Sequence, residues 1–454
     1  MSRKGIKRMI WSPDEINAVF GSSVKSGITG VSIDTRTLKE GDLFFALSGN
    51  PGPNFFSSSE SSRDGHEFIE RAIEFGAAAV VSSQRLGEVE NQILVPDTLE
   101  ALWDLARASR ARMSKPVIAV TGSNGKTTFR AWFESLLRPA VEVHGSAKSL
   151  NNHWGVPLSL ARMPRATEVG IFEIGTNHPG EIETLAKLAC PDIAVLLNVA
   201  EAHIGNFKDI LALEREKLSI ANGLSDGVFV LPVALARKTK AANLITFGEG
   251  GDVYIKQISR DPLLASFSIF GKVFEAELSP MGGARVDLIL ALLCVAKSAD
   301  FELGPILENL KSLDVPIGRG NVNKIKGIKI IDDSYNANQA SMGLAVSSLI
   351  GMNGKKVALL GEMLELGEHS ERAHQTIADR VGDNVDIVYT FGEGFRNTEF
   401  FCERVHLDSS EAFDLDKFVG YLEAGSTVLV KGSNKVFWGN HFVQRLTEAI
   451  ATKI

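Results

Sequence analysis

A glycine-rich segment, Gly122-Ser-Asn-Gly-Lys-Thr-Thr128, has the residue types of a phosphate-binding loop. Glycines let main-chain N–H groups face phosphate oxygens, Lys126 adds a positive charge, and the Thr127 hydroxyl can ligate Mg²⁺. The general spacing of such loops has a further glycine at the position of Val120. The Gly-Lys-Thr half of the pattern therefore predicts a polyphosphate site, and a plain glycine turn with a surface lysine is the alternative.

The residues on either side predict the elements that would position this loop. The apolar, β-branched run at 117–120 predicts a buried strand, and residues 127–137 predict a helix. A strand, a glycine loop and a helix in this order place the positive end of the helix dipole at the loop, which favours binding of an anion.

Polar side chains also lie at the ends of two later predicted strands. Strand 169–174 contains Glu173, and strand 193–197 is followed by His203. Open α/β sheets bind ligands at the carboxyl ends of their strands, and Mg²⁺ prefers oxygen ligands such as carboxylates. We therefore predict Glu173 as a Mg²⁺ ligand, whereas His203 fits a structural histidine as well as a metal ligand.

Three other polar groups have ordinary structural interpretations. Lys217 belongs to the charged run 214–217 of a predicted helix, which is typical of a solvated face. The pair Asn151-Asn152 lies in an irregular predicted loop, where asparagine is a common turn residue. Asp34 and Arg36 fit a surface ion pair.

The composition is that of a soluble globular protein, with 454 residues, 44% hydrophobic and 23% charged. The net charge of −7 argues against nonspecific nucleic-acid binding. The three cysteines lack the spacing of a metal site or a disulfide framework, so we expect them to be reduced. The basic N-terminus lacks a following apolar segment, and the apolar run 288–295 is far shorter than the ~18 residues of a membrane span. We expect a cytoplasmic protein without membrane insertion.

The order of predicted strands and helices indicates an α/β fold with three domains. Residues 1–97 predict a small α/β domain, with a serine-rich loop at 50–63. Residues 98–316 contain the phosphate loop within a mostly parallel sheet. Residues 317–454 alternate strands and helices again, which predicts a Rossmann-like, doubly wound sheet. The turn-rich segment Pro316-Ile-Gly-Arg-Gly320 marks the second boundary.

Five segments together resemble the Mur ligase family. These segments are Thr121-Gly-Ser-Asn-Gly-Lys-Thr-Thr128, Asn151-Asn-His-Trp-Gly-Val-Pro157, Glu173-Ile-Gly-Thr-Asn-His178, Asp332-Asp-Ser-Tyr-Asn-Ala-Asn338 and Gly361-Glu-Met-Leu-Glu-Leu-Gly367. The resemblance runs in family order from Asp34 to Gly432. The phosphate loop marks the wider family, whereas the last two segments look like the member that adds a dipeptide.

The resemblance implies an ATP-dependent ligase that joins D-alanyl-D-alanine to UDP-N-acetylmuramoyl-tripeptide through an acyl phosphate, in peptidoglycan synthesis. It implies that the first domain binds the UDP-linked substrate and that the central domain binds ATP and two Mg²⁺. The C-terminal domain would close over ATP and bind the dipeptide. The third residue of the tripeptide is left open between lysine and diaminopimelate, and we expect a monomer.

The resemblance also implies roles for individual residues. It places the nucleotide at Gly122, Ser123, Asn124, Gly125, Lys126, Thr127, Thr128, Arg319, Asp333, Tyr335, Asn336 and Asn338. It places the UDP-linked substrate at Asp34, Thr35, Arg36, Asp64, Gly65, His66, Asn151 and Asn152. It assigns the metals to Thr127, Glu173, His203 and Lys217, with Lys217 converted by CO₂ to a carbamate. The catalytic group would be Lys126, Lys217, Glu173 and His203.

The chain departs from the family pattern in three places. A His-Asn-x-x-Asn segment, which contacts the nucleotide base in the family, is replaced, with Ala284, Arg285 and Leu288 at the matching positions. The family's Lys-Gly-Ser-Arg becomes Lys431-Gly-Ser-Asn434. The loop at 50–63 is an insertion near the expected UDP site.

Three other functions are compatible with parts of the pattern. A folylpolyglutamate synthase-like ligase shares the family chemistry, and the lost asparagines suggest a non-catalytic nucleotide-binding homologue. A nucleotide switch protein would need an Asn-Lys-x-Asp segment after a strand, and both Asn-Lys pairs, at Asn323 and Asn434, lack the aspartate.

Overall fold

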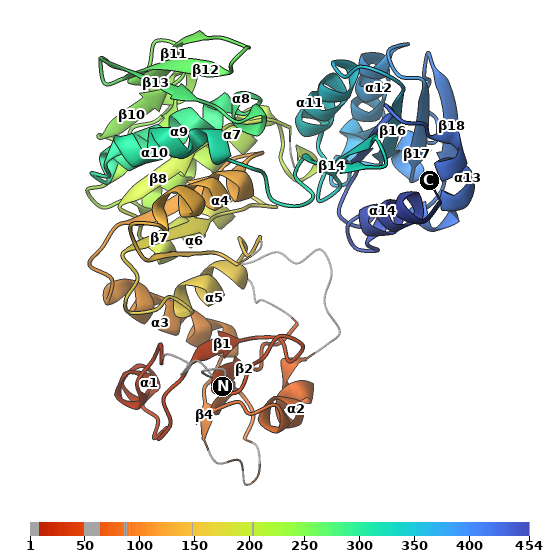
Figure 1. Ribbon diagram of the computed structural model, residues 1–454. Coiled ribbons are helices and arrows are strands. Elements are labelled where there is room, and N and C mark those ends of the chain that lie inside the picture. Colours follow the sequence, from red (N-terminus) through yellow and green to blue (C-terminus); the bar gives the residue numbers. More distant parts are fainter. Residues whose placement is uncertain are drawn as a thin grey trace, which may run out of the picture.

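The computed structural model describes residues 9–49, 64–85, 87, 89, 91–147, 149–201 and 204–453. The predicted loop at 50–63 and His203 lie outside these described residues. Within them, the chain forms three α/β units, each built on one sheet (Figure 1). Among the helices of the described ranges, none has the length and apolar character needed to cross a bilayer.

The first unit has a parallel four-stranded sheet in the order β1-β2-β3-β4. Its strands are β1 (Gly30–Ser32), β2 (Asp42–Phe45), β3 (Ala79–Ser82) and β4 (Gln92–Leu94), and its helices are α1 (Pro13–Phe20) and α2 (Ile69–Glu74). All four residues of β2 are buried, as expected of an inner parallel strand. Helix α3 (Thr98–Ala111), capped by Asp97, leads into the second unit.

The central unit has a nine-stranded sheet in the order β13-β12-β11-β10-β9-β8-β5-β7-β6. Seven of its strands are parallel: β5 (Val117–Thr121), β6 (Val143–Gly145), β7 (Val169–Glu173), β8 (Ile193–Leu196), β9 (Val228–Pro232), β10 (Leu244–Phe247) and β11 (Val253–Ile258). The strands β12 (Leu264–Ile269) and β13 (Lys272–Glu277) extend it in an antiparallel manner.

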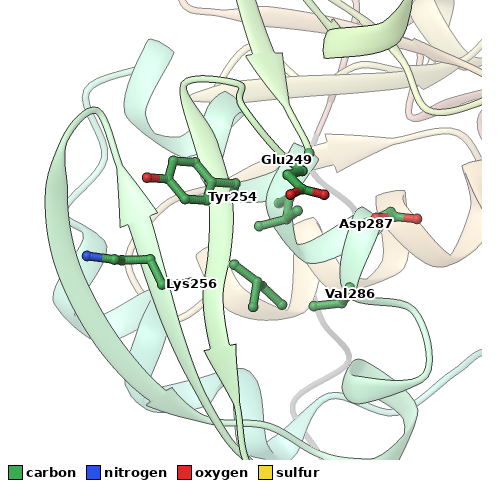
Figure 2. A pocket seen from close by; sticks show the side chains of 8 residues that line it. Glu249, Tyr254, Lys256, Val286 and Asp287 are labelled. Carbon is green, nitrogen blue, oxygen red and sulfur yellow. The ribbon is translucent and has the colours of Figure 1, made fainter.

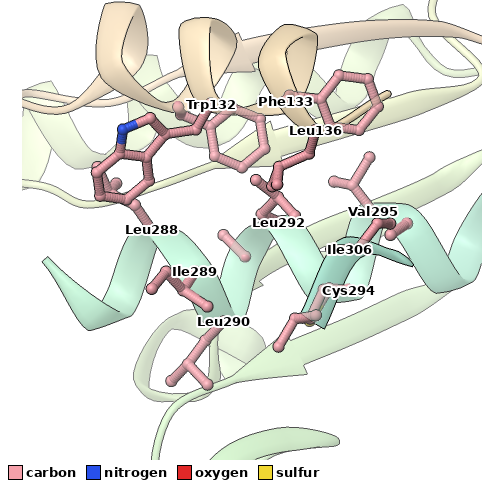
Figure 3. Packing of buried hydrophobic residues seen from close by; sticks show 14 of the residues in the cluster. Trp132, Phe133, Leu136, Leu288, Ile289, Leu290, Leu292, Cys294, Val295 and Ile306 are labelled. Carbon is pink, nitrogen blue, oxygen red and sulfur yellow. The ribbon is translucent and has the colours of Figure 1, made fainter. Parts of the chain in front are cut away.

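Helices cover both faces of the central sheet. One face carries α4 (Lys126–Leu137), α9 (Val286–Ser298) and α10 (Leu303–Asn309). The other face carries α3, α5 (Gly155–Ala161) and α6 (Glu181–Ala189), together with the end of α7 (Ile210–Leu218). Helix α9 is buried along residues 288–296, so its whole circumference is enclosed. Figure 3 shows Leu288 and Leu292 on the side of α9 that faces Trp132, Phe133 and Leu136 of α4, whereas Leu290 points to the opposite side.

The third unit has a six-stranded sheet in the order β14-β15-β19-β16-β17-β18, parallel except for the edge strand β14. Its strands are β14 (Asn321–Ile325), β15 (Ile328–Asp333), β16 (Lys356–Gly361), β17 (Ile387–Phe391), β18 (Glu403–Leu407) and β19 (Thr427–Lys431). Helices α11 (Gln339–Ile350) and α12 (Ser370–Val381) cover one face, and α13 (Leu415–Tyr421) and α14 (Phe442–Lys453) cover the other. The predicted doubly wound sheet is confirmed.

An apolar contact joins the central unit to the third unit. Ile204, Phe207 and Leu213 of the central unit belong to the same buried cluster as the helices α11 and α12. The N–H of Gly205 donates to the carbonyl of Glu365 at 3.2 Å. A Cβ at Gly205 would lie 2.7 Å from the nitrogen of Gly367, so the two backbones touch here.

Candidate active site

The glycine-rich segment forms the turn between β5 and α4. Gly125 precedes the helix with φ 87°, a left-handed conformation that favours glycine, and no side chain caps the helix N-terminus. A Cβ at Gly125 would lie 2.8 Å from Leu288 of α9. Lys126 donates to the carbonyl of Gly122 from within the loop. Burial lowers the pKa of Lys126 to about 8 against the attraction of Glu173.

Residues that follow β8 hold the phosphate loop by hydrogen bonds. The N–H of Asn124 donates to the Asn198 side chain at 2.9 Å, and the Ser123 hydroxyl donates to the carbonyl of Ala200 at 2.7 Å. Free N–H groups at a helix N-terminus and a nearby amine fit a phosphate group. Thr128 is buried in the first turn of α4.

Thr127 and Glu173 lie together at the carboxyl ends of β5 and β7. The Thr127 hydroxyl donates to Oε2 of Glu173 at 3.0 Å, and Ser149 Oγ lies 3.4 Å from the same hydroxyl. Glu173 is fully buried. Hydroxyl and carboxylate oxygens are hard donors, so this pair fits Mg²⁺, which binds few protein ligands and takes the rest from phosphate and water.

Arg130 is a site residue that the sequence did not indicate. Its Nε donates to Oε1 of Glu173 at 2.8 Å, and its guanidinium also pairs with Glu134. Arg138 binds the other oxygen of Glu134 at 2.8 Å. Because Arg130 follows Thr127 by three residues on one helix, helical spacing was the signal that could have found it.

Lys217 is buried on α7, with 2% of its surface exposed. Burial, and then the charge of Lys126, lower its pKa to about 7. The solvated face predicted for this segment is therefore wrong at Lys217. The neighbouring Glu216 is also buried, because its carboxylate accepts from the N–H groups of Gly180 and Ile182 at 2.7 and 2.8 Å.

Residues of the third unit reach the phosphate loop. Arg319 donates to the hydroxyls of Thr127 and Ser149 at 3.2 and 3.3 Å. Its guanidinium lies 3.9 Å from the ring centre of Tyr335. Asn338 donates to the side-chain oxygen of Asn124 at 2.7 Å. The structure thus brings three of the predicted C-terminal residues to the loop.

Lys431, a second residue that the sequence did not place in the site, organises the remaining two. Its buried amine forms an ion pair of 2.9 Å with Asp333 and donates to the carbonyl of Asn336 at 2.9 Å. In the family's Lys-Gly-Ser-Arg position, Asn434 donates to the carbonyl of Tyr335 at 3.3 Å.

The predicted substrate residues of the first unit lie at the carboxyl edge of its sheet. Arg36 and Asp34 form an ion pair of 2.6 Å after β1, and Thr35 between them is buried. Asp64 accepts from the N–H of His66 at 3.0 Å, and the His66 ring contacts Ser83 after β3. Gly65 donates its N–H to the carbonyl of Leu47 at 2.8 Å, after β2.

Asn151 and Asn152, the two asparagines predicted near the substrate, make different contacts. Asn152 accepts from the N–H of Gly155 at 2.9 Å and so ends the loop before α5. Asn151 packs against Gly175, two residues after Glu173, where a Cβ would lie 2.8 Å from its side chain. Asn151 is therefore beside the proposed metal ligands.

A cavity of about 450 Å³ lies next to the start of α9, between that helix and β11. Its lining residues are Gly248, Glu249, Tyr254, Ile255, Lys256, Val286, Asp287 and Leu290. Figure 2 shows Tyr254 and Lys256 directed away from the carboxylates of Glu249 and Asp287. The predicted site residues do not line this cavity. The candidate active site at the phosphate loop is therefore separate from it.

Comparison with known proteins shows which protein family this chain is related to. A model of the Mur ligase middle domain matches residues 120–296, and one of the Mur ligase, glutamate ligase domain matches residues 318–434. The UDP-N-acetylmuramoyl-tripeptide–D-alanyl-D-alanine ligase of Bacillus subtilis is 35% identical over 381 residues, covering 81% of this chain and 80% of the relative. This chain belongs to the Mur ligase family. The resemblance inferred from five segments is confirmed.

Solved structures agree with the fold of this Mur ligase. The MurF ligase of Thermotoga maritima in complex with ADP is 29% identical, with a TM-score of 0.78 over 94% of this chain and 98% of that one. MurF of Acinetobacter baumannii has a TM-score of 0.84 over 96% of this chain and 99% of that one, at 24% identity. The predicted α/β fold is confirmed.

Proposed function

We propose that this Mur ligase joins D-alanyl-D-alanine to UDP-N-acetylmuramoyl-tripeptide with the conversion of ATP to ADP and phosphate. The observation that carries the proposal is the convergence of Lys126, Thr127 and Glu173 in a chain related along most of its length to ligases of that name. The ADP bound to the Thermotoga maritima relative supports ATP as the nucleotide.

The reaction requires activation of a carboxylate, which accepts an amine poorly. Transfer of the γ-phosphoryl group to the tripeptide carboxylate gives an acyl phosphate, and attack by the dipeptide amine then releases phosphate. Lys126 and the N-terminus of α4 would stabilise the negative charge that develops on the phosphoryl oxygens. Mg²⁺ held by Thr127 and Glu173 would neutralise part of that charge.

The burial of Lys217 supports a carbamate on this residue. With a pKa of about 7, its amine is largely neutral at physiological pH and can attack CO₂. The product is an N-carboxylate, formed with release of one proton, which would supply oxygen ligands for a second Mg²⁺. His203 would serve the same metals, as the resemblance implies.

The three units would divide the substrates among them. The carboxyl edge of the first sheet would bind the UDP portion through residues 34–36 and 64–66, with Asn151 and Asn152 near the muramoyl-peptide. The third unit would bring Arg319, Asp333, Tyr335, Asn336 and Asn338 to ATP and would bind the dipeptide. The chain passes from the first sheet to the second between β4 and β5, and from the second sheet to the third between β13 and β14, which supports domain boundaries near residues 97 and 316. The three free cysteines support a cytoplasmic location.

Phosphate release from ATP tests the function directly. We expect release to require both D-alanyl-D-alanine and a UDP-N-acetylmuramoyl-tripeptide, with the pentapeptide product seen by mass spectrometry. Parallel assays with the lysine and diaminopimelate tripeptides identify the third residue. Turnover with a folate and glutamate would favour the folylpolyglutamate synthase-like alternative. ADP binding without any turnover would favour a non-catalytic homologue.

A further inference from the structure

Arg285 links the central unit to the segment that carries Arg319. It precedes α9, and its Nη2 donates to the main-chain oxygen of Arg319 at 2.9 Å. The same nitrogen would lie 2.6 Å from a Cβ at Gly320, so a side chain there would force the guanidinium to shift. Its Nη1 lies 3.7 Å from the sulfur of Met281, which holds the other end of the guanidinium.

The linker is held from the opposite side by the third unit. The N–H of Gly320 donates to the carbonyl of Asp332 at 2.7 Å, and the N–H of Tyr335 donates to the carbonyl of Gly318 at 3.1 Å. Among the contacts of the described residues, Arg285 is the residue of the central unit whose side chain bonds to the main chain of this linker, whereas Thr127 and Ser149 bond to the Arg319 side chain. Arg285 therefore fixes the main chain of Arg319 relative to α9.

We propose that Arg285 is a positioning residue of the nucleotide site, which acts by holding the Arg319 backbone so that the Arg319 guanidinium reaches Thr127. The distances form a continuous path: 2.9 Å from Arg285 to the Arg319 carbonyl and 3.2 Å from the Arg319 guanidinium to the Thr127 hydroxyl. A hydrogen bond from a charged donor is stronger than a neutral one, which suits a contact that must hold two units together. The assignment rests on the proposed function.

Nucleotide affinity tests the proposal without requiring turnover. Titration calorimetry with ADP would compare the wild type with Arg285→Met, which keeps the apolar stem but removes the donor. We expect Arg285→Met to weaken binding about tenfold, as for a lost charge-assisted hydrogen bond. Arg285→Lys retains a donor and should stay within about threefold of the wild type. Arg260→Ala, at an exposed arginine between β11 and β12, is the control.

A double variant separates this route from direct phosphate binding. If Arg285 acts through Arg319, Arg285→Met should weaken ADP binding less than about twofold in an Arg319→Ala background. Multiplying effects would mean that Arg285 binds the nucleotide itself and would overturn the proposal. Wild-type affinity in Arg285→Met, or equal losses in the Met and Lys variants, would overturn it as well.

Steady-state kinetics adds a readout that simple destabilisation would not move. We expect the KM for ATP to rise about tenfold in Arg285→Met while the KM for the muramoyl-peptide is unchanged. A loss of folded protein would instead lower kcat without a change in either KM. If the wild type binds ADP but does not ligate, the proposed function fails, whereas the ADP titrations still decide the role of Arg285.

Discussion

Lys126 acts on Lys217 as a second influence after burial: burial first, and then the charge of Lys126, lower the pKa of the Lys217 amine to about 7. Lys126 lies on the phosphate loop and Lys217 on α7, so the relationship connects two elements that are distant in sequence. Since Lys126 has itself a pKa lowered to about 8 by burial, the two amines titrate in neighbouring ranges.

We expect a bell-shaped pH dependence of kcat/KM. Lys217 must be neutral to react with CO₂, so activity should rise as pH increases through about 7. Lys126 must be charged to bind phosphate, so activity should fall above about 8. Lys217→Ala and Lys126→Ala should each lose nearly all turnover while they still fold normally. Bicarbonate or a short carboxylate should rescue only Lys217→Ala, and full activity of that variant would refute the carbamate.

The same buried amine should make the stability depend on pH. The folded protein disfavours the charged form of Lys217. The resulting loss of folding stability is complete below about pH 7, and it is relieved as the pH rises toward 10.5, the ordinary pKa of a lysine. In CO₂-free buffer, Lys217→Met should therefore raise the Tm more at pH 6 than at pH 10, by roughly 5 °C at pH 6. Lys187→Met, at a surface lysine, is the control. An equal shift at both values would contradict the prediction.

Arg130 should set the affinity for the divalent cation. Without its hydrogen bond to Oε1, the Glu173 carboxylate is free to rotate away from Thr127. Arg130→Ala should raise the half-saturating Mg²⁺ concentration about tenfold, and Mn²⁺ binding followed by electron paramagnetic resonance should weaken in parallel. Arg138→Ala removes the more exposed partner of Glu134 and should have a smaller effect. Similar losses in both variants would assign the effect to Glu134 instead.

Gly205 should be required for the contact between the central and third units. A Cβ there would lie 2.7 Å from the nitrogen of Gly367, which is closer than a Cβ can approach backbone. Gly205→Ala should separate the two units, seen as an increase in the radius of gyration by small-angle scattering, and should lower kcat at least tenfold. Gly304→Ala is a matched control, because its Cβ would meet nothing within 4 Å. An unchanged radius in Gly205→Ala would remove this contact from the closure of the enzyme.

Local sequence was sufficient for the phosphate loop and for the strands predicted at 117–120, 169–174 and 193–197, which correspond to β5, β7 and β8. The loop could be predicted because glycines, a lysine and a threonine directly follow an apolar β-branched run, so the whole signal lies within residues 117–128. The edge strands β14 and β18 and the helix α13 were not predicted, since each is short and has few buried residues. β14, for example, alternates between half-buried and exposed positions and lacks any fully buried residue.

Local pattern alone could not place two buried lysines, Lys217 and Lys431, because their burial depends on contacts between distant elements. Lys217 looked solvated because its neighbours are charged, yet it is buried on α7, whose Glu216 bonds to the start of α6. Lys431 lies on a buried strand, where its charge is balanced by Asp333, which is 98 residues earlier in the chain. Spacing along one element cannot show such pairs, whereas Arg130 was within reach of helical periodicity.

The enclosure of α9 has a consequence for how the enzyme moves. A helix buried on every side cannot slide or tilt without disrupting the core around it. Arg285, at the N-terminus of this helix, is therefore a fixed attachment point for the linker. Rotation of the third unit must therefore either break the hydrogen bond from Arg285 to the Arg319 carbonyl or take place with this bond intact. Such an arrangement favours two distinct positions of the third unit relative to the central unit, with a sharp transition between them, over a continuous range of positions.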